Sequence, residues 1–385
     1  MNTVPAQFDA IRSYDDSDLR QVLPLLFDDD SFCQVLQSLF PSVSLAVLKE
    51  RASQCSTILD VQKSFLYPYI ENLLQSASEG AVLDDSAIAD KTQAYSFISN
   101  HRDIVLDPAL LCFLLIRNQF PDTAEIAIGD NLLIFDWIKH IVRLNRAFIV
   151  QRGLNLRETL LASQRLSAYM HYVITQKHHS LWIAQREGRA KDSSDRTQDS
   201  VLKMIAMGRS DNVIASLREM NIVPLTISYE YDPCDYLKAQ EFQQKRDDAA
   251  FKKSKADDLQ NMHTGIMGRK GHIRFVMAPP VNEWLDTLGD VPRAELFPML
   301  SQHIDKEIHR HYSLFPGNYI AFDQLHSQSR FHDRYSAQET EAFNRYVSGQ
   351  LEKIELPNPD MPFLRERLLT MYANPVGNWI EANEE

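Results

Sequence analysis

A histidine flanked by two aspartates is the first group of residues in this chain that could do chemistry. His101 lies between an apolar segment at 94–99, which predicts a strand, and an unbroken apolar run at 109–116, which predicts a buried helix. Asp103 and Asp107 follow within six residues. Neutral imidazole accepts a proton near pH 7, and a carboxylate fixes its tautomer and stabilises the imidazolium. The pattern predicts a general base, and the alternative is a hydrogen-bonded loop histidine.

The two aspartates leave a choice of partner for His101. Asp107 stands directly before Pro108, which is a helix-start signal: the carboxylate can cap free N–H groups, and proline fits the first helical position. Asp107 therefore predicts either a helix cap or the orienting carboxylate, and Asp103 is the other candidate for that second role.

A cluster of basic residues follows downstream. Between positions 138 and 157 the chain has no acidic residue and five basic ones, which are Lys139, Arg143, Arg146, Arg152 and Arg157. Arg152 comes directly after a predicted strand at 147–151 and before Gly153. Because the arginine fork matches the oxygens of a phosphate, this pattern predicts an anion site. The alternative is a basic helix face paired with acidic neighbours.

A third charged segment follows the predicted strand at 180–185. Glu187 could hold a substrate hydroxyl or order nearby arginines, and Gly188 would let backbone N–H groups approach a ligand or an oxyanion. Arg189 and Lys191 add positive charge. The alternative is a salt-bridged turn.

A proline marks a fourth segment, the predicted strand at 222–229. Pro224 cannot donate to a β-ladder, so it indicates an edge strand or a strand start.

Composition limits the class of protein. The 385 residues allow two or three domains, and a net charge of −12 argues against a general nucleic-acid binder. Four dispersed cysteines without a CxxC pair indicate a reducing compartment rather than a disulfide framework or zinc ribbon. The polar N-terminus and the absence of an apolar run of ~20 residues predict a cytoplasmic protein, with membrane contact at most peripheral, on the inner face.

The pattern of elements predicts three parts. Residues 1–80 form a helical N-terminal subdomain, 82–285 an α/β domain with a mixed, largely parallel sheet flanked by helices, and 286–385 a helical C-terminal extension. The charge-dense stretch 238–258 predicts a solvated helix or excursion. The predicted strands are 94–99, 123–128, 147–151, 180–185, 222–229 and 272–277. The predicted helices between them are 108–119, 132–143, 157–176, 199–207 and 235–250.

In this order, the four segments resemble the glycerophospholipid acyltransferase family, which includes glycerol-3-phosphate and 1-acylglycerol-3-phosphate (lysophosphatidate) acyltransferases. The matching positions are Asn100-His101-Arg102 to Asp107, Phe148-Ile149-Val150-Gln151-Arg152, Glu187-Gly188-Arg189 and Val223-Pro224. The resemblance covers about residues 85–285. Two departures exist: five residues rather than four separate His101 from Asp107, and Arg189 is shifted by one position.

The resemblance implies transfer of a fatty acyl group from acyl-CoA or acyl carrier protein to a hydroxyl of a glycerol-3-phosphate or lysophosphatidate acceptor. His101 would be the base, and Asp107 is favoured as its orienting partner because it stands at the start of the apolar helix. Arg152, Arg189 and Lys191 would hold the acceptor phosphate, with backbone N–H groups near Gly188 at the oxyanion. No metal or redox cofactor is implied.

Other classes remain as alternatives. A catalytically silent lipid-binding or scaffold protein is one, supported by the extra residue in the first motif, and an acyltransferase for a phosphate-free lyso-lipid is another. A metal-dependent hydrolase and a serine hydrolase are disfavoured because the chain contains no HExxH and no G-x-S-x-G. The acceptor, the acyl-chain length, the donor and the oligomeric state stay open.

Overall fold

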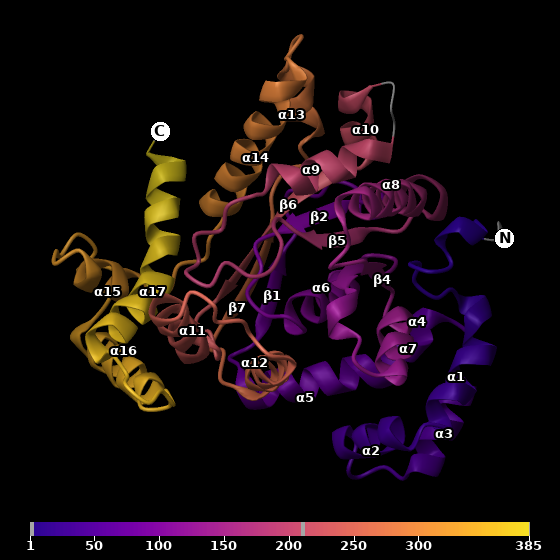
Figure 1. Cartoon of the computed structure of the whole chain (residues 1–385), viewed down its shortest axis with the longest axis horizontal. Helices are drawn as coiled ribbons and strands as arrows, with labels where there is room; N and C mark the ends of the chain where they lie inside the picture. Colours follow the sequence, from indigo (N-terminus) through magenta and orange to yellow (C-terminus); the bar gives the residue numbers. More distant parts are fainter. Residues whose placement is uncertain (1–3, 209–211, 385) are drawn as a thin grey trace.

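A seven-stranded β-sheet lies at the centre of the computed structural model, which describes residues 4–208 and 212–384 (Figure 1). The strand order is β1-β7-β6-β2-β5-β3-β4. All strand pairs are parallel except β6 with β7, which is antiparallel, so the predicted α/β class with a mixed, largely parallel sheet is confirmed. The strands are β1 Ala81–Asp84, β2 Ser96–Ser99, β3 Glu125–Gly129, β4 Ala147–Val150, β5 Leu181–Ala184, β6 Ile222–Tyr229 and β7 Ile273–Met277.

The sequence pattern found the six longer or more buried strands and missed β1. This strand pairs only with β7 at the edge of the sheet, and Val82 is half exposed. In β1 the face that carries Val82 and Asp84 is exposed and the other face buries Leu83, so this strand has no continuous apolar run. The pattern therefore gave no signal there.

Helices cover both faces of the sheet. One face packs against α5 (Tyr67–Ala77) and α6 (Leu106–Arg117). The other packs against α8 (Leu156–Tyr172), α9 (Asp199–Ile205), α10 (Val213–Glu219), α13 (Asn282–Thr287) and α14 (Arg293–Arg310). The apolar residues of α6 are buried all round, as expected for a helix enclosed between the sheet and α5.

Two further helical groups lie at opposite ends of the molecule (Figure 1). The N-terminal group packs its apolar residues against α7 (Asp136–Leu144), and the C-terminal group packs against α11 (Asp235–Asp247). The N-terminal group is α1 Leu19–Phe27, α2 Asp30–Leu39, α3 Leu45–Ser53 and α4 Ile58–Val61; the C-terminal group is α15 Pro316–Leu325, α16 Ala337–Leu351 and α17 Met361–Asn383. In the described ranges, no helix is both long and apolar enough to cross a bilayer.

The charge-dense stretch 238–258 departs from the prediction of a solvated helix in its first part. Lys238 and Glu241 of α11 are 2% and 5% exposed. Lys238 forms an ion pair with Asp232, and Glu241 pairs with Lys191 and Lys245. Charge density alone cannot reveal that a helix face is buried when each buried charge finds an opposite partner. The helix after it, α12 (Lys255–Met267), has a largely exposed surface.

The prediction for Pro224 is also wrong in part. The strand that carries it, β6, is an interior strand between β7 and β2. The carbonyl of Pro224 accepts a hydrogen bond from Ala278 N (2.9 Å), directly after the last residue of β7. The missing N–H therefore coincides with the end of the β7 ladder, so no ladder bond is lost inside the sheet.

Candidate active site

His101 and Asp107 form a hydrogen-bonded pair at the carboxyl end of β2. His101 Nδ1 lies 2.8 Å from Asp107 Oδ2, and Asp107 is fully buried. Because a carboxylate oxygen can only accept, Nδ1 carries the proton in this contact, and the neutral ring then has its acceptor at Nε2. The ring packs edge-on against Trp182, with centroids 5.5 Å apart. The imidazole is thus held in one orientation and one tautomer.

The loop between β2 and α6 wraps around the same carboxylate oxygen. Asp107 Oδ2 also accepts hydrogen bonds from Arg102 N (2.6 Å) and Asp103 N (3.0 Å). Asp103 does not contact His101; its Oδ1 accepts from Val105 N (2.9 Å) and Leu106 N (2.8 Å) at the start of α6. Between the two aspartates, the partner of His101 is therefore Asp107.

This geometry corrects the predicted helix start. The helix begins at Leu106, so Asp107 and Pro108 are its second and third residues rather than its cap and first residue. Proline is still tolerated there because the first helical N–H groups have no partner within the helix. The capping role belongs to Asp103, whose pKa burial raises, with a further contribution from the Asp107 charge.

A further carboxylate, Asp195, which the sequence analysis did not identify, anchors the loop between β2 and α6. Asp195 is fully buried and accepts from Arg102 Nη2 (2.5 Å), Tyr312 OH (2.6 Å) and Asn100 Nδ2 (3.3 Å). Asn100 also exchanges two hydrogen bonds with the backbone of Ile227 in β6. The residues on both sides of His101 are thus anchored to distant parts of the chain.

Two buried polar atoms, one of them in this pair, are left without a hydrogen bond among the described residues. Asp107 Oδ1 and the hydroxyl oxygen of Tyr229 have no hydrogen-bond partner among the described residues. Tyr229 ends β6, and after burial Asp107 is the group that contributes most to holding the Tyr229 pKa well above its usual value. The Tyr229 hydroxyl therefore lies near the Asp107 carboxylate, and it is a candidate donor to that group.

A cavity of about 680 Å³ opens beside His101, at the carboxyl ends of β3, β4 and β5. Ligands bind at this edge of open α/β sheets, because the loops there connect strands to helices. The apolar part of the lining includes Ile104, Pro108, Ile126, Ile128, Leu132, Val150, Leu166, Ile183, Val201 and Met204. The volume lies in the range of small-molecule sites.

The lining also includes residues that the sequence predicted for the site. Arg152, Glu187, Gly188, Arg189 and Lys191 all line it together with His101. Pro224 does not, since it lies further back in β6.

Arg152 and Glu187 join two of the predicted motifs directly. Arg152 Nη1 donates to Glu187 Oε1, and Arg152 N donates to Asp130 Oδ1 (3.2 Å). Gly188 has φ +69°, a conformation that side-chain-bearing residues adopt less easily, so glycine is favoured at this turn. Glu187 therefore orders Arg152 in this structure.

Three arginines of the cavity keep buried N–H groups without a partner among the described residues. These groups are Arg152 Nε, Arg186 Nε and Arg189 Nη1. Buried donors without acceptors are costly, and arginine side chains that line a cavity suit an anion such as phosphate. Arg186 was not among the predicted site residues; its position, directly after a strand and before Glu187, was the available signal.

Lys191 differs from the arginines because it already has a carboxylate partner. Its Nζ pairs with Glu241 Oε1. Burial lowers the pKa of Lys191 to about 8, although the ion pair with Glu241 acts in the opposite direction. Lys191 thus contributes less free positive charge to the cavity than the sequence suggests.

The basic cluster predicted at residues 138–157 does not form a single site. Arg143 is buried and donates to the backbone oxygens of Arg12 (2.8 Å) and Asp9 (3.0 Å). Arg146 forms an ion pair with Asp122 at 2.7 Å. Lys139 and Arg157 are exposed, so Arg152 is the member of the cluster that lines the cavity. The sequence could not show this, because the partners of Arg143 and Arg146 lie far away in the chain.

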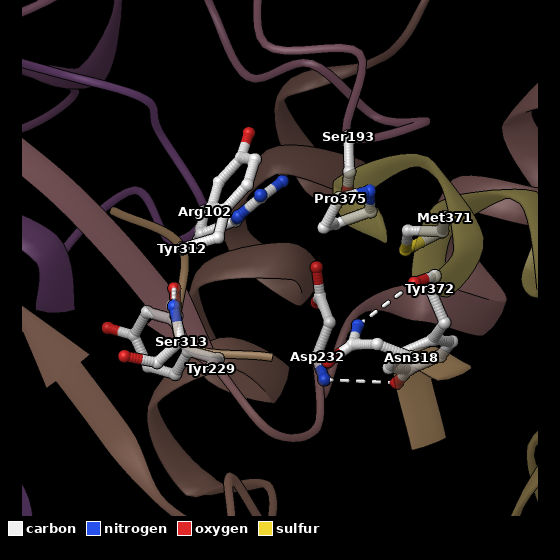
Figure 2. Close-up of a pocket in the computed structure, with 11 residues that line it drawn as sticks. Arg102, Ser193, Tyr229, Asp232, Tyr312, Ser313, Asn318, Met371, Tyr372 and Pro375 are labelled. Carbon is white, nitrogen blue, oxygen red and sulfur yellow. Dashed lines mark hydrogen bonds between the residues drawn. The ribbon is translucent and has the colours of Figure 1, made fainter. Parts of the chain in front are cut away.

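A second cavity, of about 30 Å³, lies behind the His101 loop (Figure 2). Arg102 and Asp232 line it, and Asp232 N donates to Tyr372 OH (3.1 Å) while Asn318 Nδ2 donates to Tyr372 O (2.9 Å). Its size suits ordered water rather than a substrate. It belongs to the contact between the sheet and the C-terminal helices.

Comparisons with known proteins add little to this description. No protein-family model matches the chain, and no curated protein matches its sequence. Among solved structures, the crystal structure of the 1-acyl-sn-glycerophosphate (LPA) acyltransferase PlsC from Thermotoga maritima matches with a TM-score of 0.40 and 11% sequence identity. The match covers 77% of this chain and 99% of that chain. A similarity this low decides neither fold nor function.

Proposed function

We propose that the protein is an O-acyltransferase that moves a fatty acyl group from a thioester to a hydroxyl of a glycerolipid-type acceptor. The observation that carries the proposal is the His101–Asp107 pair at a cavity lined by apolar residues and by arginines. The apolar residues suit an acyl chain, and the arginines suit a phosphate. The order of motifs seen in the sequence supports the same function.

In the proposed reaction, His101 removes the proton of the acceptor hydroxyl as its oxygen attacks the thioester carbonyl. A C–O bond forms, the C–S bond breaks, and the imidazolium returns its proton to the departing thiolate. Asp107 stabilises the imidazolium, and general-base assistance of this kind contributes about 10²–10⁴ in rate. A thioester is already activated, so the reaction requires no covalent enzyme intermediate and no metal.

The finer assignments also belong to the proposal. The acceptor class is glycerol 3-phosphate or a lysophosphatidate, because Arg152, Arg186 and Arg189 line the cavity and arginine matches the oxygens of a phosphate. The donor is acyl-CoA or acyl carrier protein. Positioning of the acceptor by the arginines would add to the rate independently of the base.

The test is an acceptor screen with the purified protein and a radiolabelled acyl thioester. We expect His101→Ala to lower kcat at least about 100-fold with an unchanged far-UV circular dichroism spectrum. His332→Ala, at an exposed histidine of the C-terminal region, is the control and should retain full activity. Thioester consumption that does not depend on any acceptor, or a His101→Ala variant with more than about a tenth of the wild-type rate, would contradict the proposal.

A further inference from the structure

The first two turns of α8 extend into solvent with three uncovered leucines. Leu156 is 89% exposed, Leu160 is 50% exposed and Leu161 is 54% exposed. Every residue from Asn155 to Leu161 is exposed, whereas the second half of α8 is largely buried. We call these turns, residues 155–161, the α8 lip. Scattered exposed leucines are ordinary, but three within six residues form a contiguous apolar surface.

The face of α8 that carries Leu156 and Leu160 continues into the core with two serines. Leu156, Leu160, Ser163 and Ser167 follow one another at helical spacings of four, three and four residues, so they share one face of α8. Ser163 lines the large cavity, and Ser167 is buried and donates to Ile205 O (3.0 Å). The same face therefore leads from the core, past the cavity, and out into solvent.

The lip stands beside the mouth of the cavity. The strands β3 and β4 are parallel neighbours, so the helices that follow them begin at the same edge of the sheet. The residue before α7 is Phe135, which is 57% exposed, and the first residue of α8 is Leu156. Both follow strands whose residues line the cavity, β3 and β4, so they lie toward the edge of the sheet where the cavity is found.

The charge of this region differs from that of the whole chain. Among the exposed residues of 130–165, three are basic, Lys139, Arg157 and Arg165, and two are acidic, Asp136 and Glu158, although the chain carries a net charge of −12. Arg143 and Arg146 are buried and do not contribute to this surface. An apolar helix end with flanking cations matches a bilayer interface that contains anionic lipid.

We propose that the α8 lip and Phe135 form a membrane-docking surface that inserts into the interface of an anionic bilayer and places the cavity mouth at the lipid. The choice of a bilayer rests on the proposed function, since an acceptor or product with a long acyl chain resides in lipid. The lip would let such a molecule pass between bilayer and cavity with little exposure of its chain to water.

The experiment measures co-sedimentation of the full chain with vesicles of phosphatidylcholine, with and without phosphatidylglycerol. The variants are Leu156→Glu and the double variant Leu156→Glu/Leu160→Glu. Leu25→Glu is the matched control, because Leu25 is 56% exposed on α1, in the N-terminal helical group. We expect binding to the anionic vesicles to fall by about tenfold or more in the lip variants and to stay unchanged in the control.

A second measurement separates this inference from the proposed function. Acyl transfer to a water-soluble, short-chain acceptor should be unaffected by Leu156→Glu, since Leu156 does not line the cavity. Wild-type protein that transfers acyl groups but ignores the vesicles, or lip variants that bind like wild type, would overturn the docking surface and leave the acyltransferase intact. Vesicle binding that depends on the lip, without any acyl transfer, would support the docking surface and contradict the proposed enzymatic activity. A wild-type dimer in solution that Leu156→Glu dissociates would assign the lip to a second copy and overturn the membrane assignment.

Discussion

One oxygen of Asp107 holds both the imidazole of His101 and the loop between β2 and α6 that carries it. Asp107 Oδ2 receives the imidazole N–H and two backbone N–H groups from the next two residues. Because the donors belong to consecutive residues, the loop cannot change conformation without breaking several charge-assisted hydrogen bonds. The orientation of the His101 imidazole is therefore fixed in the absence of any ligand.

Replacing the two aspartates should separate chemistry from folding. Asp107→Asn should lower kcat by about 10²-fold or more, since an amide can no longer accept all three N–H groups and stabilises the imidazolium poorly. Asp103→Asn should lower stability by about 1 kcal/mol through the weakened helix start, with a smaller change in kcat. Steady-state kinetics and urea denaturation measure both effects; the reverse ranking in kcat would transfer the orienting role to Asp103.

Tyr229 should act on the reaction through Asp107. If its hydroxyl donates to Asp107 Oδ1, Tyr229→Phe should lower kcat by about tenfold and leave the KM values unchanged. The acid limb of the pH–rate profile should move to higher pH, because Asp107 without this donor attracts the proton on His101 more strongly.

A control for Tyr229 is Tyr95→Phe, which removes a buried hydroxyl that donates to Asp90 O (2.8 Å) away from the cavity. This variant should lose some stability without a shift in the pH–rate profile. If the pH–rate profile of Tyr229→Phe does not shift, Tyr229 only packs against its neighbours and does not act through Asp107.

The site residues that could be predicted from the sequence are those marked by their immediate neighbours in the chain. His101, Asp107, Arg152, Glu187 and Gly188 each follow a strand, and the structure brings all of them except buried Asp107 to the cavity lining. The contacts of Asp195 and Tyr229 were out of reach, because Asp195 bonds to groups more than 90 positions away and Tyr229 lies more than 100 positions from Asp107.

At the scale of elements, the site depends on parallel strands that end at the same edge. The loops after β4 and β5 meet through the ion pair between Arg152 and Glu187, although β3 lies between these two strands. Period and composition predicted most strands, yet they could not predict this strand order. The order depends on which strands pair, and pairing is a property of distant segments.

Arg152 should distinguish the acceptor from the donor. Arg152→Ala should raise the KM for a phosphorylated acceptor and lower its kcat/KM about 10- to 100-fold, in line with the loss of one arginine–phosphate contact of ~1.5–3 kcal/mol. The KM for the acyl thioester should hardly change. Arg20→Ala, at an exposed arginine of α1, is the control. An effect on the thioester alone would assign the arginine to the phosphates of the donor.

At the scale of the whole molecule, the C-terminal helices hold the segment that follows the third motif. Asn374 and Asn378 of α17 donate to the backbone oxygens of Asp192 (2.7 Å) and Ser194 (3.2 Å). Asp305 of α14 accepts from Thr197 N (2.8 Å) and Thr197 Oγ1 (2.5 Å). This segment contains Asp195, which anchors the loop of His101, so the C-terminal helices support the site as well as the sheet.

Asp305 should make the stability of the fold depend on pH. Burial raises its pKa from 3.8 to about 6, so the folded state holds a proton that the unfolded chain releases near pH 4. The stability that the neutral form provides is complete below about pH 4 and is lost as pH rises to about 6. A difference of this size between the folded and unfolded pKa corresponds to about 2–3 kcal/mol in the free energy of unfolding.

Asp305→Asn keeps an oxygen for Thr197 and cannot ionise, so its stability relative to wild type should rise between pH 4 and pH 6 and then stay constant. The midpoint of urea denaturation, measured from pH 4 to pH 8, follows this difference. The exposed Asp333→Asn serves as the control and should show no such rise. A difference between Asp305→Asn and wild type that does not vary with pH would mean that Asp305 is already ionised in the folded protein. The effect of burial on the pKa of Asp305 would then be offset by groups other than Thr197. Thr197 would donate to an ionised carboxylate rather than to a neutral carboxyl group, and that charge would hold the segment that carries Asp195.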